Sequence, residues 1–432
     1  MQQHDILICG GGLVGASLAL ALSQLEFDVA LAEAVPFGKP EQPSFDERTT
    51  AISNGTQRIF NALGVWPLIE RSATPIKKIH VSDRGRFGFA RIDAQEQDLP
   101  QLGFVVVNRV MGEALWRRLQ ESKVKIYAPA RVTALKLVGD RQAITLTSDL
   151  QPTAYDLHGR RECRTSQEHC PASLQSRLVI AADGARSIVR EAAGIGATHK
   201  DYEQTAVIAT IACQKFHSHV AYERFTAEGP IAMLPLSDAR VGLVWTLARK
   251  VANEVMQLND ADFIVRLQAA FGLRLGRFMQ VGKRYSYALS LTQSEQHIAE
   301  RLAIIGNAAQ GLHPIAGQGF NLGLRDAACL AEVLADACRE NPQVDPGGVG
   351  VLRRYADWRG EDRKGIVRFT DGLVRLFAQD FAPIKTVRDI GMLLFDLSPQ
   401  AKDYLSQLSL GAAGKIPRMA RGGSLRDPVN RE

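Results

Sequence analysis

The stretch Gly10-Gly11-Gly12-Leu13-Val14-Gly15 decides the fold of this chain. It ends an apolar run over residues 5–11 that is typical of a buried parallel strand. The Ala/Leu-rich segment 14–25 then predicts a helix, and residues 28–33 predict a second strand. Gly10 permits a tight turn, Gly12 a close approach of backbone to a pyrophosphate, and Gly15 close packing of helix on strand.

An acidic residue extends this βαβ pattern. Glu33 ends the second strand, where a carboxylate can accept hydrogen bonds from a ribose. Glycines alone also mark plain turns, but the strand, helix and terminal acid together favour a dinucleotide site. An acid here favours an unphosphorylated adenosine ribose, which indicates FAD or NAD rather than NADP.

Length and composition set the broad class. The 432 residues are too many for one ordinary core, so two or three substructures are expected. A hydrophobic content of 46% with 23% charged residues is that of a globular protein. The net charge of +6 is compatible with anionic cofactors or lipid surfaces. Without basic, aromatic-interleaved stripes or zinc-finger spacing, nucleic-acid binding is not expected.

The cysteines and the termini indicate a reducing compartment. The six cysteines are scattered, and the N-terminus lacks a basic signal-peptide region, so we expect a cytoplasmic protein without a spanning helix. His158, Cys163, His169 and Cys170 match no zinc spacing, so no metal site is predicted. They lie in a polar segment, 150–176, that we interpret as a surface excursion.

The rest of the chain alternates between strand and helix patterns. A helix is expected at 110–121, and a hairpin at 131–149 with a turn at Gly139-Asp140. A strand at 177–182 precedes four closely spaced strands that predict a separate antiparallel sheet, over 204–213, 219–225, 230–236 and 240–247. Helices are expected at 260–271, starting at an Asp cap, near 320–338, and through 350–410.

Two further motifs follow predicted strands. The first is Asp183-Gly184-Ala185-Arg186, where a strand ends and a helix begins. The second runs from Gly306-Asn307-Ala308-Ala309-Gln310 through His313-Pro314 to Gly317-Gln318-Gly319-Phe320-Asn321.

With all three motifs in order, the chain resembles the class A flavin monooxygenases, the aromatic hydroxylases of the para-hydroxybenzoate hydroxylase fold. Asn307 and Gln310, where most members have Asp and His, resemble the branch that contains the bacterial 2-octaprenyl-6-methoxyphenol hydroxylases of ubiquinone biosynthesis.

The resemblance implies an α/β fold with a Rossmann-like FAD-binding domain and an inserted antiparallel substrate domain. The FAD-binding domain is expected over 1–75, 105–202 and 297–350, and the substrate domain over 76–104 and 203–296. A helical region is expected over 351–412, followed by a basic, disordered tail over 413–432. The apolar positions of 366–397 suit a packed face, or alternatively a groove for a prenyl tail or a partner subunit.

The resemblance also assigns site residues. The cofactor-binding set is Gly10, Gly12, Gly15, Glu33, Arg48, Arg109, Asp183, Gly184, Asn307, Gly317, Gln318, Gly319 and Asn321. Asp183 is equally suited to cap a helix, and Asn307 can accept a hydrogen bond from the ribityl chain through its amide oxygen. His313 and Pro314 are the catalytic candidates, although His313 is equally suited to holding its loop by a hydrogen bond. Phe225, Trp245, Tyr285 and Tyr287 are candidates for an apolar wall around the substrate.

The implied reaction needs no protein nucleophile or metal. Tightly but non-covalently bound FAD is reduced by transient NAD(P)H, and a flavin C4a-hydroperoxide transfers oxygen from O2 to the ring of a polyprenylated methoxyphenol. The family context also allows contact with ubiquinone-biosynthesis subunits and peripheral contact with the inner face of the bacterial membrane. The alternatives are a sister hydroxylase acting at another ring position, a flavin-dependent isoprenoid reductase, and a non-catalytic flavin-bound assembly subunit.

Overall fold

An eight-stranded sheet carries the glycine-rich turn. The computed structural model describes residues 1–37, 46–85, 88–148, 172–311, 318–360 and 415–427. Five neighbouring strands of this sheet are parallel. Along the sheet the strands are β18 (Ile298–Ala299), β19 (Leu302–Ile304), β11 (Ser173–Ala181), β1 (Gln2–Cys9), β2 (Val29–Ala32) and β8 (Lys125–Tyr127). The predicted βαβ unit, with α1 (Leu13–Leu22) between β1 and β2, is confirmed.

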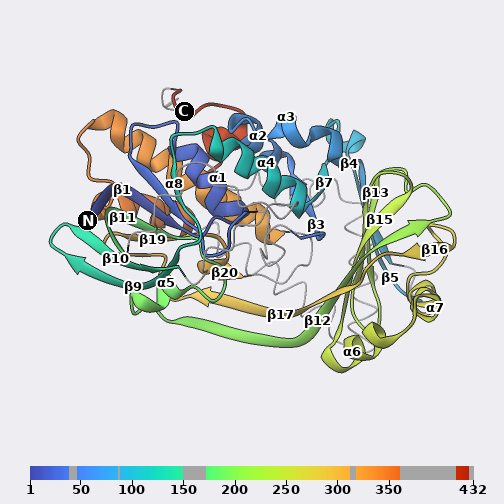
Figure 1. Ribbon diagram of the computed structural model, residues 1–432. Coiled ribbons are helices and arrows are strands. Elements are labelled where there is room, and N and C mark those ends of the chain that lie inside the picture. The colour runs from blue at the N-terminus through green and yellow to red at the C-terminus, as the bar shows by residue number, and fades with distance from the viewer. Residues whose placement is uncertain (38–45, 86–87, 149–171, 312–317, 361–414, 428–432) are drawn as a thin grey trace, which may run out of the picture.

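Helices cover one face of this sheet and a hairpin covers the other. Alternate residues of β1 divide between the faces: Ile6 and Ile8 pack with the helices, whereas Leu7 and Cys9 pack with the hairpin. The helical layer contains α1, α4 (Asn108–Gln120) and α8 (Gln318–Glu340) (Figure 1). The opposite layer contains β9 (Arg131–Val138), β10 (Arg141–Thr147) and α5 (Ile188–Ala192). The helix and hairpin expected at these positions are therefore confirmed.

The second large sheet has nine strands and lies at the other end of the molecule (Figure 1). Its path is β20 (Gln310–Gly311), β17 (Tyr285–Ser294), β12 (Ala197–Cys213), β15 (Arg240–Ala248), β14 (Ile231–Pro235), β13 (Val220–Phe225), β5 (Lys78–Asp83) and β6 (Phe89–Asp93), with β16 (Phe278–Val281) beside β12. Only the β13–β5 pair among these is parallel. The four strands predicted between 204 and 247 are all present.

Two helices cover the outer face of the nine-stranded sheet, α6 (Arg249–Gln257) and α7 (Asp260–Phe271). The cap predicted for α7 was wrong by one residue, because Asn259 precedes the helix and its side chain accepts the Asp262 N–H at 2.9 Å. Trp245 is fully buried in this outer layer, with its ring edge-on to Phe263 of α7.

A small sheet lies between the two large ones. It contains β3 (Thr49–Ser53), β7 (Gly103–Val107) and β4 (Thr74–Ile76). Between β3 and β4 the chain forms α2 (Asn54–Ala62), α3 (Trp66–Ile69) and the 3-10 turn η1 (Glu70–Ser72), and the 3-10 turn η2 (Gln95–Gln97) precedes β7. Ser53 caps α2 by accepting the Thr56 N–H at 3.1 Å. A Cβ atom on Gly242 of β15 would lie 2.5 Å from the Thr49 hydroxyl, so β3 rests directly on the nine-stranded sheet.

The strands β12 and β17 join the two ends of the molecule as an antiparallel ribbon (Figure 1). β12 is 17 residues long, and it pairs with β17 from Ala197 to Ile208. Since these strands run through both regions, the domain boundaries expected from the sequence stay predictions.

The C-terminal part of the chain packs on α8. Residues 349–360 are helical, whereas the predicted helical face 366–397 and most of the excursion, 149–171, lie outside the described residues. The end of that excursion, from Ser173, is strand rather than loop.

The prediction of a disordered tail was wrong for residues 415–427. They include α12 (Arg418–Arg421), and Met419 and Leu425 are buried in the core. The physical reason is charge pairing, because buried Arg418 donates to Glu332 through its backbone N–H and forms an ion pair with Asp336, both on α8. A basic segment therefore has acidic partners that its local sequence does not reveal.

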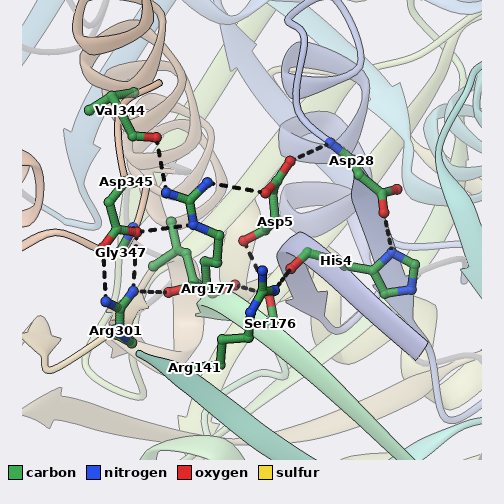
Figure 2. A network of polar contacts seen from close by, with 11 residues as sticks. His4, Asp5, Asp28, Arg141, Ser176, Arg177, Arg301, Val344, Asp345 and Gly347 are labelled. Carbon is green, nitrogen blue, oxygen red and sulfur yellow. Dashed lines mark hydrogen bonds and ion pairs between the residues drawn. The ribbon is translucent and has the colours of Figure 1, made fainter. Parts of the chain in front are cut away.

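A polar network joins the parallel strands near their amino-terminal ends (Figure 2). Arg177 of β11 lies 3.4 Å from Asp5 of β1 and 3.5 Å from Asp345. Arg301, just before β19, pairs with the same Asp345 at 2.8 Å. Ligands of open α/β sheets bind at the carboxyl ends of the strands, so we interpret this network at the opposite ends as structural.

Candidate functional site

All three sequence motifs meet at the carboxyl edge of the parallel sheet. The Gly10 N–H donates to the Ala32 carbonyl at 2.8 Å, and the Ala182 N–H donates to the Cys9 carbonyl at 2.8 Å. The Ile305 N–H completes the series by donating to the Ala181 carbonyl at 3.0 Å. Segments up to three hundred residues apart thus end side by side, where an α/β sheet binds its ligand.

The glycine turn has no room for side chains at two of its positions. Gly10 has a φ of +106°, and a Cβ atom there would lie 2.5 Å from the Ala182 carbonyl oxygen. A Cβ atom on Gly15 would lie 1.9 Å from the Gly10 carbonyl oxygen. Gly12 precedes α1 without a side-chain cap, and the first turn of α1 has no acidic residue. The amides at this helix end are therefore suited to an anionic group.

Glu33 is tied to the glycine turn. Its carboxylate accepts the Gly11 N–H at 2.5 Å and the Val35 N–H at 2.8 Å, and the side chain is buried. These bonds fix the end of β2 against the turn. The predicted contact between Glu33 and a ribose stays a prediction.

The second motif is arranged as a helix cap. The Asp183 carboxylate accepts the Ser187 hydroxyl and the Val189 N–H, at 2.5 and 3.1 Å, and burial raises the pKa of Asp183 above its usual value. Gly184 has a φ of +87°, which favours glycine. Buried Arg190 donates to the Ala308 carbonyl at 2.9 Å and so joins the second motif to the third. The N-cap of α5 is Ser187, whose hydroxyl accepts the Arg190 N–H at 3.0 Å, so Asp183 supports the cap rather than forming it. A role of Asp183 in cofactor binding stays a prediction.

The third motif is held from behind by a buried ion pair. The Gly306 N–H donates to Asp326 of α8 at 3.1 Å, and Asp326 pairs with Arg359 at 2.8 Å. Both side chains of this pair are 0% exposed. Asn307 follows in the 3-10 turn η3 (Gly306–Ala308) and is exposed, so its amide can be reached by a ligand.

Part of the third motif lies outside the described residues, namely His313, Pro314 and Gly317. Gln318 and Gly319 begin α8, and a Cβ atom on Gly319 would meet no atom within 4 Å. The assignments of these five residues stay predictions.

Asn321 anchors α8 to the small sheet. Its amide oxygen accepts the Ser53 N–H at 2.9 Å and the Thr56 hydroxyl at 2.8 Å, while its amide nitrogen donates to the Ala51 carbonyl at 3.0 Å. The amide is thereby committed to the fold, and its predicted contact with the cofactor is untested.

Arg48 lies where the small sheet meets the nine-stranded sheet. Its guanidinium group is 2.6 Å from the Asp46 carboxylate and lies over the Tyr287 ring, 4.7 Å from the centroid. The Tyr287 hydroxyl donates to the same carboxylate at 3.0 Å. The position of Arg48 therefore depends on a residue of β17, and its assignment to the flavin stays a prediction.

Arg109, the second predicted cofactor arginine, is exposed. It pairs with Glu47 at 2.7 Å and with Glu113 at 2.9 Å, and these carboxylates raise the pKa of Arg109. A cofactor phosphate would have to share this arginine with the two acids, so the assignment stays a prediction.

The inner face of the nine-stranded sheet is the surface that meets the small sheet and Arg48. Gly242 and Tyr287 belong to it, whereas Trp245 points to the outer layer because it alternates with Gly242 and Val244 along β15. Including Trp245 in the substrate wall was therefore wrong.

A carboxylate that the sequence analysis did not single out lies on this inner face. Glu223 lies on the same face of β13 as Ala221 and Phe225, and burial raises the pKa of Glu223 to about 7. An acid between two apolar residues in a predicted strand was the available signal.

Within the described residues, no group of His, Cys, Asp or Glu side chains could hold a metal ion. His158, Cys163, His169 and Cys170 lie outside this part of the chain. Among the helices that the structure describes, none is both long and apolar enough to cross a bilayer.

Comparison with known proteins gives one family and a consistent set of relatives. The sequence model of the FAD binding domain family matches residues 3–359. The ubiquinone hydroxylase UbiL of Rhodospirillum rubrum is 36% identical over 422 residues, which cover 97% of this chain and 92% of that protein. The 3-demethoxyubiquinol 3-hydroxylase of Escherichia coli is 30% identical over 415 residues, covering 95% and 99% of the two chains.

Among solved structures, p-nitrophenol 4-monooxygenase PnpA from Pseudomonas putida superimposes with a TM-score of 0.74. The match covers 96% of this chain and 100% of that one at 17% sequence identity, and so it shows a shared fold. The α/β architecture with a dinucleotide-binding sheet and an antiparallel second sheet is thus confirmed.

Proposed function

The chain belongs to the FAD binding domain family, and from this premise we propose that it hydroxylates the aromatic ring of a polyprenylated methoxyphenol in ubiquinone biosynthesis. FAD is its cofactor, and NAD(P)H is the reductant typical of such FAD-dependent aromatic hydroxylases. Relatives named for ubiquinone hydroxylation match nearly the whole chain, which supports the pathway. The methoxyphenol itself rests on the resemblance at Asn307 and Gln310.

The observation that carries the proposal is the convergence of three motifs around a glycine turn that has no room for side chains. The backbone at Gly10 and Gly15 leaves no space for a Cβ atom, and the amides at the start of α1 lack a side-chain cap. A pyrophosphate is the group that such a helix end accommodates. The residues present therefore fit the adenosine diphosphate half of FAD.

The chain's own residues have three tasks in this reaction. The α1 amides bind the pyrophosphate, Glu33 binds the adenosine ribose, and Asn307 binds the ribityl chain. The amino-terminal end of α8 would stabilise negative charge on the redox-active ring of bound FAD by on the order of 1 kcal/mol. Bound FAD supplies the transfer of electrons from NAD(P)H and the activation of O2.

The inner face of the nine-stranded sheet then orients the substrate ring and excludes water. Tyr285 and Tyr287 belong to this face, whereas His313 and Pro314 are proposed to lie close to the reacting atoms. His313 would move a proton or hold its loop.

Two measurements test the proposal in sequence. Purified protein should be yellow, and heat or acid should release intact FAD; a colourless protein indifferent to added FAD would contradict the cofactor assignment. Given NADH or NADPH and a short-chain prenylated 2-methoxyphenol under 18O2, the protein should form a product with one labelled phenolic oxygen. NAD(P)H oxidation that yields only peroxide would contradict hydroxylation and leave flavin binding intact.

A second candidate is hydroxylation at another ring position. It is favoured by the relative named 3-demethoxyubiquinol 3-hydroxylase, which matches 95% of this chain. The quinone intermediate that accumulates when the protein is removed from its cell distinguishes the two positions. Saturation of an isoprenoid double bond without 18O incorporation would instead indicate a reductase. Flavin binding without any turnover would indicate an assembly subunit.

A further inference from the structure

The inner face of the nine-stranded sheet has a middle row of side chains that crosses seven neighbouring strands. Strand pairing places them in one line: Ala90, Val81, Glu223, Ala232, Val244, Ile208 and Tyr285. Directly paired residues share a face of the sheet. The row is apolar except for Glu223 and the terminal Tyr285.

The row has a defined position between the small sheet and Arg48. On one side, Ala221, Leu234 and Ile92 of the inner face pack in a core cluster with Val105 of β7 and Ile76 of β4. On the other side, the neighbouring row includes Thr246, Ala206 and Tyr287, which are paired across β15, β12 and β17. Because Tyr287 contacts Asp46 and Arg48, this side of the row faces Arg48, a predicted cofactor-binding residue.

Glu223 differs from the other carboxylates of the site. Among the described residues, its carboxylate has no hydrogen-bond donor and no cation within ion-pair distance. The side chain is partly exposed, yet protein atoms surround the carboxyl group densely enough for desolvation to raise its pKa to about 7. Desolvating a carboxylate without a hydrogen-bond or ion-pair partner costs free energy of folding, and such groups concentrate at functional sites.

The other titratable groups on this side do not supply a partner. They are Asp83 of β5, Tyr285 and Tyr287 of β17, and the Asp46–Arg48 pair before β3. Arg48 is paired with Asp46, and the neighbouring cation on β13, Arg224, alternates to the outer face. The polar partner of Glu223 is therefore to be sought in a ligand.

We propose that Glu223 is the specificity-determining residue of the substrate face: its carboxylate accepts a hydrogen bond from the phenolic hydroxyl of a neutral ring, and its charge excludes rings that carry a carboxylate. This inference rests on the proposed ring hydroxylation and names the chemistry of its substrate. A neutral phenol satisfies the unpartnered acceptor, whereas an aryl carboxylate would bring a second negative charge into a poorly solvated face.

The experiment compares three small probes with holoenzyme: 2-methoxyphenol, 1,2-dimethoxybenzene and 4-hydroxybenzoate. Dissociation constants are measured at pH 8, above the Glu223 pKa of about 7, from the perturbation of flavin absorbance, with the wild type and the isosteric variant Glu223→Gln. The matched control is Glu228→Gln, because Glu228 lies on the exposed turn after β13 and pairs only at the surface with Arg266.

Glu223→Gln should weaken 2-methoxyphenol binding about tenfold, which corresponds to the loss of one charge-assisted hydrogen bond. Binding of 1,2-dimethoxybenzene, which has no hydroxyl donor, should stay unchanged. Binding of 4-hydroxybenzoate should strengthen about tenfold because the repulsion is removed. The control should behave as the wild type with all three probes.

Equal losses for the phenol and its dimethyl ether would indicate a merely structural role and overturn the proposal, as would unchanged binding of all three probes. The labelled-oxygen assay separates this result from the proposed function. Glu223-dependent binding without hydroxylation would refute the function and spare the inference. Hydroxylation with binding that ignores Glu223 would refute the inference and spare the function.

Discussion

The carboxyl edge of the parallel sheet and the inner face of the nine-stranded sheet differ in how their acidic side chains are partnered. At the edge, the carboxylates of Glu33, Asp183 and Asp326 each accept hydrogen bonds from backbone or hydroxyl donors of the protein. On the inner face, the Glu223 carboxylate has no such donor among the described residues. The acids of the first region are thus partnered within the protein, whereas we propose that Glu223 is partnered by the substrate.

The difference fits the ligands that we propose for the two regions. A cofactor of fixed structure can be held by backbone amides whose positions are set by a satisfied network. A substrate must be distinguished from similar rings, and an unsatisfied polar group discriminates strongly because it rejects any ring that leaves it unpaired. In this proposal, the parallel sheet holds the cofactor rigidly and the nine-stranded sheet selects the substrate.

The largest effect is expected from substituting Asp326, whose hydrogen bonds hold the carboxyl edge of the parallel sheet. The Asp326→Ala substitution would remove the carboxylate that pairs with fully buried Arg359, and it would remove the acceptor of the Gly306 N–H. We expect a loss of about 3–5 kcal/mol in the free energy of unfolding, measured by urea denaturation.

The matched control for Asp326 is Glu340→Ala. It breaks the exposed pair with Arg354 and should cost less than about 1 kcal/mol. Equal effects of the two substitutions would mean that the buried network does not hold the edge together.

A smaller effect is expected at Gly15. A methyl group there would overlap the Gly10 carbonyl oxygen, so Gly15→Ala should displace α1 from the turn at a cost of about 1–3 kcal/mol and deplete bound FAD. The ratio of flavin to protein absorbance measures the loss. Gly350→Ala is the control because its new methyl group would meet no atom within 4 Å. Undiminished flavin in the Gly15 variant would separate the turn from cofactor binding.

The pH dependence of stability tests whether Glu223 on the inner face lacks a partner within the protein. Because the folded-state pKa of Glu223, about 7, lies above its ordinary value of 4.5, the folded protein holds this proton to higher pH than the unfolded chain. The contribution of Glu223 to stability is therefore most favourable below pH 4.5 and is lost as pH rises through 7.

Glu223→Gln removes this titration. Relative to the wild type, the variant should gain about 1–2 kcal/mol between pH 5.5 and pH 8, with allowance for the partial exposure of Glu223. Thermal unfolding at the two pH values measures the gain. A stability difference independent of pH would show that Glu223 is satisfied within the protein.

The smallest effect concerns Glu33. Glu33→Gln keeps one acceptor oxygen and loses the other, so one of the bonds to Gly11 and Val35 is broken. We expect FAD affinity to fall by about fivefold to tenfold, near 1 kcal/mol, in a titration of the apoprotein. Glu26→Gln, a change at an exposed site, should leave the affinity unchanged. An effect on Glu26 as large as that on Glu33 would contradict the assignment.

The sequence predicts the local parts of the fold well. The βαβ unit at Gly10, the hairpin at Gly139-Asp140 and the strands between 204 and 247 follow from periodicity and turn residues, which are properties of neighbouring positions. The order of Arg418 could not be predicted in this way, because its partners Glu332 and Asp336 lie more than eighty residues earlier. The local sequence of a short basic segment predicts that it is solvated, because it does not show which distant acids will pair with it.

The residues of the candidate site also divide into those with a local sequence signal and those that depend on distant contacts. Gly10, Gly15 and Glu33 could be found because their spacing is a local signature of a strand-turn-helix unit. The alternation along β13 marks Glu223 as an acid among apolar residues, but its role could not be predicted, because that depends on which face of β13 is inward and on which hydrogen-bond donors lie near it. The same two-residue alternation that placed Trp245 in the outer layer turns Glu223 to the inner one.

The order of strands in the parallel sheet has a consequence for how the chain is made. β11 lies between β1 and β19, and 302 − 173 = 129 residues separate the starts of β11 and β19. During translation, the edge of β11 at Val179–Ala181 therefore stays unpaired while the strands of the second sheet emerge, whereas β10 already pairs with Ser173–Ser176. An open edge is a template for pairing with other chains. We expect the nascent protein to be most prone to aggregation, and most dependent on chaperones, during synthesis of this interval.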